Sequence, residues 1–103
     1  MIRKAALDSV YIPSEDVVAR EIEDAIIIVP IVSGITDVED ELLTLNDTGK
    51  AIWQKLDGRA TLRGVIEALT TEFSAPAATI KEDVLGLVSE LLRRRMVVEV
   101  SAE

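Results

Sequence analysis

Residues 42–58 have the sequence LLTLNDTGKAIWQKLDG, and the spacing of the apolar side chains changes within this stretch. Before Asn46 the residues suit an extended chain, and we expect a β-strand over Glu41–Leu45. Alternation divides the strand between two faces, with Leu43 and Leu45 on one and Leu42 and Thr44 on the other. The side chains of one face can therefore pack on a core while the other face stays free.

After Asn46 the spacing becomes helical, because Ile52, Trp53 and Leu56 form one apolar stripe. Asn46 or Asp47 is placed to cap this helix, and Gly58 can take the left-handed conformation that ends it. The stretch therefore predicts a strand that leads directly into a short helix.

Upstream, two further strands are expected. Val17–Glu21 and Ala25–Val29 are rich in β-branched residues and are separated by the polar pair Glu23-Asp24, which is typical of a hairpin. Pro30 has no N–H to donate, so strand pairing on one side should stop or bulge there. Residues 1–13 lack clear periodicity, and we expect them to be a loose N-terminal segment.

Downstream, two longer helices are expected. Thr61 caps the first, whose apolar residues recur at helical intervals. Its stripe consists of Leu62, Val65, Ile66, Leu69 and Phe73. Thr79-Ile80-Lys81-Glu82 fits a capping box that opens the second, which should run to about Arg94. Val97–Val100 could form one last short strand.

The expected order is three strands, three helices and a possible terminal strand, which predicts an α+β fold with helices packed on a three-stranded antiparallel sheet. A chain of 103 residues fits a single domain spanning residues 1–103. Six side chains are expected to be buried in its core: Trp53, Leu62, Ile66, Leu69, Val84 and Leu91.

The last helix has an apolar arc of about 180°, wider than the roughly 100° that one core contact needs. Ile80, Val84, Leu87 and Leu91 form the ordinary core stripe, with Val88 beside it. Leu85, Leu92 and Met96 extend the arc further round. Either this second stripe is buried against another helix, or it lines a groove that a partner fills.

Composition excludes several kinds of chemistry. The chain has no Cys, and therefore no disulfide, thiolate metal site or thiol nucleophile. It has no His, the commonest general base and metal ligand. There is no Gly-rich phosphate loop or nucleophile elbow, so we expect no enzyme activity, no bound metal and no cofactor. Without an export signal or an apolar run of about 20 residues, the cytosol is the expected compartment.

The net charge of −8 lies in the N-terminal half, since residues 1–48 carry three basic and eleven acidic side chains. It disfavours nucleic acid as a partner. It could serve solubility or a basic partner. The acidic run Asp37–Glu41 precedes the third strand and lacks the Gly and spacing of a calcium loop. A solvated loop and a contact with a basic segment remain open.

The stretch that starts at Leu42 also resembles the pyrroloquinoline quinone biosynthesis protein D family. The similar features are a strand ending in Leu45-Asn46, Thr48-Gly49 entering a helix, Ile52-Trp53 within it, Asp57-Gly58 closing it and Thr61-Leu62 after it. The resemblance extends over Val17–Val98. It implies a winged-helix-like domain that acts as a peptide chaperone.

In that family, the leader segment of a ribosomally made precursor peptide adds as a strand to the third β-strand and lies against the third helix. The domain presents the leader to a modifying enzyme, often a radical S-adenosylmethionine enzyme. The resemblance therefore implies a peptide-binding site made of one strand and one helix flank. Its members would be Glu41, Leu42, Leu43, Thr44 and Leu45 on the strand, and Val84, Leu85, Val88 and Leu92 on the helix.

Two other functions are compatible with such a fold. A winged-helix regulator would bind DNA through a recognition helix, but the expected helices carry carboxylates such as Glu67, Glu72 and Asp83 that would repel phosphates. A scaffold subunit would bind a folded protein in the same groove. The residues themselves favour the peptide-binding function over DNA binding.

Overall fold

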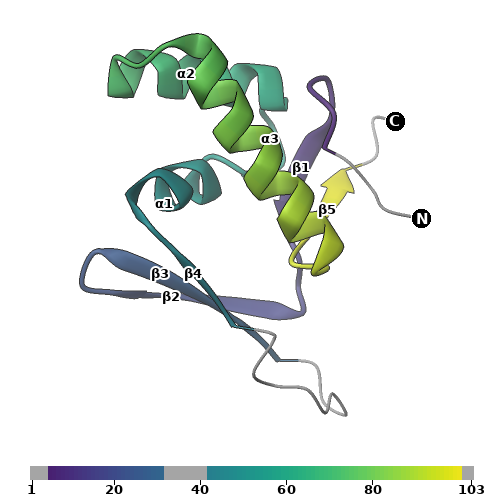
Figure 1. The fold of residues 1–103 in the computed structure, drawn as a ribbon. Coiled ribbons are helices and arrows are strands. Elements are labelled where there is room, and N and C mark those ends of the chain that lie inside the picture. The colour runs from purple at the N-terminus through teal and green to yellow at the C-terminus, as the bar shows by residue number, and fades with distance from the viewer. Residues whose placement is uncertain (1–4, 32–41, 101–103) are drawn as a thin grey trace.

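The structure is a computed structural model that describes residues 5–31 and 42–100. Figure 1 shows three helices above a three-stranded sheet, with a small second sheet beside the last helix at the right of the view. The elements follow in the order β1 (Val10–Pro13), β2 (Val17–Ile22), β3 (Ala25–Pro30), β4 (Leu43–Leu45), α1 (Asp47–Gln54), α2 (Leu62–Phe73), α3 (Ala77–Arg93) and β5 (Val97–Val100). The predicted three-stranded antiparallel sheet followed by three helices is confirmed.

The larger sheet has the strand order β2-β3-β4, with β4 at one edge. β2 and β3 form the predicted hairpin, in which Glu23 takes a positive φ of 57° at the turn. Pro30 pairs with Val17 and ends β3. The β3–β4 ladder runs only from the pair Ile26↔Leu45 to Ile28↔Leu43. The position opposite Pro30 on this side would be Glu41, which lies outside the described residues, so the effect of Pro30 on this pairing stays a prediction.

The family-like stretch builds the junction between β4 and α1. The side-chain oxygen of Asn46 accepts a 2.9 Å hydrogen bond from the Gly49 N–H, which caps α1. A Cβ on Gly49 would lie 3.2 Å from the Cβ of Leu45, so glycine lets the helix approach the strand closely. At the other end Gly58 has a φ of 81°, and its N–H donates to the Tyr11 carbonyl. These residues fix the angle at which helix and strand meet.

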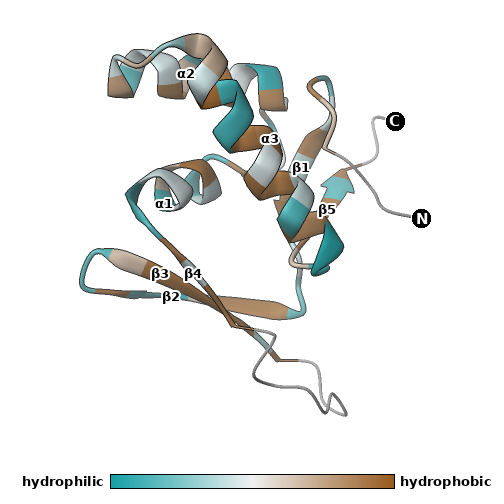
Figure 2. Cartoon of the chain, in the orientation of Figure 1, coloured by the Kyte–Doolittle hydropathy of each residue, from teal (hydrophilic) through white to brown (hydrophobic). Residues whose placement is uncertain are grey.

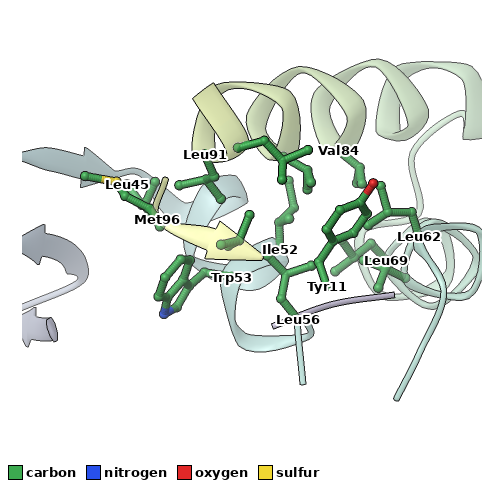
Figure 3. Packing of buried hydrophobic residues seen from close by; sticks show 14 of the residues in the cluster. Tyr11, Leu45, Ile52, Trp53, Leu56, Leu62, Leu69, Val84, Leu91 and Met96 are labelled. Carbon is green, nitrogen blue, oxygen red and sulfur yellow. The ribbon is translucent and has the colours of Figure 1, made fainter. Parts of the chain in front are cut away.

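The core lies between the inner face of the sheet and the three helices. Ile26, Ile28 and Leu45 from the sheet are buried with Ile52 and Trp53 of α1. In Figure 3, Tyr11, Leu62, Leu69 and Val84 gather at one end of this cluster, and Leu45, Leu91 and Met96 lie at the other. All six residues predicted to be buried are buried: Trp53, Leu62, Ile66, Leu69, Val84 and Leu91.

The N-terminal segment differs from the prediction. Residues 10–13 are not loose but form β1, which pairs antiparallel with β5 as a second, two-stranded sheet. Tyr11 is 1% exposed, and its hydroxyl accepts a hydrogen bond from the Ala6 N–H. The partner strand lies at the opposite end of the sequence, so no local periodicity signals the pairing.

Two helix details are also corrected. α3 begins at Ala77 after Pro76, with no side-chain cap, so the expected capping box at Thr79 does not open it. Proline suits this position because its fixed φ fits the helix start. Phe73, expected in the buried stripe of α2, is the last residue of that helix and is 41% exposed. The stripe continues past the point where the core ends.

The wide apolar arc of α3 is largely covered. Val88, Leu92 and Met96 are all buried, and α3 contacts α1, α2 and β5. The first of the two alternatives is therefore confirmed for most of the second stripe, with β5 as well as helices covering the arc. Figure 2 shows brown, apolar bands alternating with teal, hydrophilic ones along α3.

Candidate peptide-binding cleft between β4 and α3

The hydrogen-bond pattern of the β2–β3–β4 sheet determines which backbone groups of β4 face away from β3. The Ile31 N–H donates to the Asp16 carbonyl at 2.8 Å, so these two residues form a hydrogen-bonded pair in register with β2–β3. In an antiparallel sheet, backbone groups point to alternate sides along a strand. Ile26 and Ile28 therefore direct their backbone groups toward β4, where they meet Leu45 and Leu43.

The same alternation directs the N–H and C=O of Thr44 away from β3. No other strand of the described residues covers this side of β4, because β4 is at the edge of its sheet. The backbone groups of Leu42 point the same way as those of Thr44, two residues along. Within the part of the chain that the structure describes, the edge thus offers unpaired donors and acceptors to an added strand.

A cleft of about 360 Å³ lies beside this edge. One wall is β4 with the start of α1, and the other is the side of α3 that carries Asp83 and Leu87. Its lining residues are Leu43, Thr44, Leu45, Asn46, Thr48, Gly49, Ile52, Asp83 and Leu87. Four of them are apolar side chains, which we term the apolar floor of the cleft: Leu43, Leu45, Ile52 and Leu87.

The structure places most of the predicted strand residues at this cleft. Leu43, Thr44 and Leu45 line it. Leu45 is 3% exposed, whereas Leu42 is 50% exposed and lies on the opposite face, as the alternation predicted. Glu41 falls outside the described residues. The strand therefore supplies backbone edge and apolar floor together.

The predicted helix residues need correction. Val84 and Val88 have 0% exposure, belong to the closed core and are not among the residues that line the cleft. Leu92 is 9% exposed and also belongs to that core, and Leu85 is half-buried away from the cleft. Of the predicted helix residues, none lines this cleft, although α3 itself forms one of its walls.

Leu87 and Asp83, which were not among the predicted site residues, are the α3 residues that line the cleft. Leu87 was expected in the core stripe, but it is half-buried and lines the cleft. The two residues are four apart, so they lie one helical turn from each other on the same side of α3. A helical wheel of α3 places Asp83 next to Leu87 at one edge of the apolar stripe, so their proximity could have been predicted from the sequence.

Several charged side chains on α1 and α3 form ion pairs. Lys50 of α1 forms an ion pair with Glu21 of β2, and that hydrogen bond raises the pKa of Lys50. On α3, hydrogen bonds from Arg93 and Arg94 lower the pKa of Glu90. None of the hydrogen bonds or ion pairs found in the described residues engages Asp83, which is exposed.

The acidic run Asp37–Glu41 lies outside the described residues. Within residues 5–31 and 42–100, the structure contains no cluster of three or more His, Cys, Asp or Glu side chains arranged to hold a metal ion. In the same residues, no helix is long and apolar enough to cross a membrane.

Comparison with known proteins assigns the family. The family model described as coenzyme PQQ synthesis protein D (PqqD) matches residues 33–97, which contain β4, all three helices and the cleft. The chain belongs to the PqqD family. The match also confirms the resemblance found in residues 42–58.

Two curated proteins are similar to just over half of the chain. A PqqA binding protein of Gluconobacter oxydans (strain 621H) is 32% identical over 62 residues, which are 60% of this chain and 65% of that protein. A PqqA binding protein of Xanthomonas campestris pv. campestris (strain B100) is 32% identical over 57 residues, or 55% and 62% of the two chains. The chain thus spans just under two thirds of each relative.

A solved structure has the same fold. TbiB1 in complex with the TbiA(beta) leader peptide aligns with a TM-score of 0.68, covering 84% of this chain and 93% of that chain at 20% sequence identity. This likeness shows that the arrangement of sheet and helices is shared beyond the reach of close sequence similarity.

Proposed function

We propose that this PqqD-family chain is a non-catalytic peptide chaperone. It binds the leader segment of a ribosomally made precursor peptide and presents it to a modifying enzyme, such as a radical S-adenosylmethionine enzyme. The activity fits the cytosol, where a chain without cysteine needs no oxidising compartment. Two relatives named as PqqA binding proteins, and a fold shared with a leader-peptide complex, support the proposal.

The observation that carries the proposal is the open edge of β4 beside an apolar cleft. Backbone groups of Leu42 and Thr44 can pair with an extended peptide whatever its sequence. Alternate side chains of that peptide would then point toward Leu43, Leu45 and Leu87, where their burial favours binding. Affinity and selectivity thus come from two different parts of one site.

The test is a titration of the isotope-labelled chain with candidate leader peptides, followed by backbone amide NMR shifts. The proposal predicts saturable shifts at residues 42–46 and around Asp83 and Leu87, with small shifts in β1 and β5. Binding that shifts mainly the β1–β5 sheet would contradict it. Absence of binding by every leader peptide from the chain's own biosynthetic gene neighbourhood would also contradict it.

A further inference from the structure

The cleft contains one charged lining side chain among the described residues, and that charge is negative. Asp83 has no ion-pair partner there, whereas the neighbouring Lys50 and Glu90 are engaged by Glu21 and by two arginines. An unpaired carboxylate beside an apolar floor favours a ligand that brings a cation together with an apolar group.

The spacing of the two helix residues matches the repeat of a strand. Asp83 and Leu87 are separated by four residues, or about 6 Å along the helix axis. Side chains two residues apart on a strand lie on the same face and about 6.6–6.8 Å apart. A strand added to β4 can therefore place one side chain near Leu87 and the next inward side chain near Asp83.

We infer that the cleft selects a peptide with a basic and an apolar residue two positions apart, both directed inward, with the basic side chain at Asp83 and the apolar one against Leu87, Leu43 and Leu45. The residue between them points to the outer face of the sheet beside Thr44 and is weakly selected. This inference rests on the proposed peptide-binding function and adds the chemistry of the ligand.

The negative net charge of the protein also favours a basic peptide. The chain carries −8 overall, and Asp47 at the start of α1 adds a second exposed carboxylate next to two lining residues, Asn46 and Thr48. A peptide with acidic side chains at the inward positions would meet this charge unpaired. A basic peptide would associate faster as ionic strength falls.

The experiment selects ligands from a displayed library of random 16-residue peptides on the full-length chain, and repeats the selection on Asp83→Asn. The matched control is Glu82→Gln, which removes a neighbouring exposed carboxylate that does not line the cleft. The parent and the control should enrich Lys or Arg two positions from Leu, Ile, Val or Phe, in either order. Asp83→Asn should lose the basic preference and keep the apolar one.

Synthetic peptides from one enriched clone make the test quantitative. Replacing its Lys with Gln should weaken binding about two- to fivefold, as for a partly exposed ion pair, and replacing it with Glu by about tenfold. Both differences should fall below about twofold in a folded Asp83→Asn variant. Equal binding of all three peptides to the parent would overturn the inference and leave peptide binding intact. If no enriched peptide binds at residues 42–46, the proposed function is overturned and the inference with it.

Discussion

Replacing Leu87 with aspartate should separate peptide binding from folding, because α3 offers a matched control. Leu85 and Leu87 are both half-buried on the same helix and both pack against the core cluster. Only Leu87 lines the cleft. Leu92 would be a poor site for the same change, since it is 9% exposed and a charge there would disturb the core.

The expected loss of peptide affinity in Leu87→Asp follows from the cost of burying a charge without a partner. A carboxylate at position 87 would lie beside the apolar floor formed by Leu43 and Leu45, close to the existing charge of Asp83. Peptide binding would then have to desolvate it, which should cost more than about 1.4 kcal/mol, or more than tenfold in affinity. Leu85→Asp should lose a similar amount of packing but change affinity by less than about threefold, since it adds no charge to the cleft.

The assay is fluorescence anisotropy of a labelled peptide, with circular dichroism of both variants to establish that they are folded. Thermal unfolding should show comparable losses of stability for the two substitutions. Equal loss of affinity in both variants would refute the assignment of the cleft to one face of α3. A folded Leu87→Asp variant that binds like the parent would refute it as well.

Three further predictions concern stability. Tyr11→Ala should lower the free energy of unfolding by about 3–5 kcal/mol in chemical denaturation, because Tyr11 is fully buried in the core; a loss below about 1 kcal/mol would contradict the packing of β1. Gly86→Ala should raise it by about 0.5–1 kcal/mol, since Gly86 is inside α3 and an added Cβ would meet nothing within 4 Å; a decrease would contradict that geometry. Hydrogen bonds from the Arg59 and Ala60 N–H groups lower the pKa of Asp57, so its contribution to stability is present above the ordinary value of 3.8 and is lost as the pH falls through that region. The unfolding midpoint of the parent should therefore exceed that of Asp57→Asn at pH 7 and approach it below about pH 4, and a constant difference would refute the assignment.

The sequence was sufficient for elements whose signals are local. The hairpin of β2 and β3, the change of period at Asn46 and the caps at Asn46 and Thr61 depend on neighbouring residues, and the structure contains all of them. The β1–β5 pair was missed because Val10 and its partner Val100 lie at opposite ends of the chain and each strand has only four residues. A strand at Val97–Val100 was expected, as found for β5, but periodicity within so short a segment does not indicate its partner.

Only one wall of the cleft could be predicted from the sequence, because only local signals are visible there. Alternation along the strand fixes which face Leu43 and Leu45 share, so one wall of the cleft followed from sequence. The helix wall did not, because periodicity identifies an apolar arc without identifying its neighbours. Val88 is covered within the core, whereas Leu87 borders a space beside β4 that no described element fills. The family-like residues themselves mostly build the β4–α1 junction.

The central claim is that the backbone of Thr44 pairs with an added strand, and amide hydrogen exchange measures this directly. In the free chain the Leu43 and Leu45 amides should be protected by β3, whereas the Thr44 amide should exchange rapidly at the open edge. Saturation with a leader peptide should slow the exchange of Thr44 by about tenfold or more and leave the other two nearly unchanged. A Thr44 amide that is already protected in the free chain, or that exchanges equally fast in the complex, would contradict strand addition at β4.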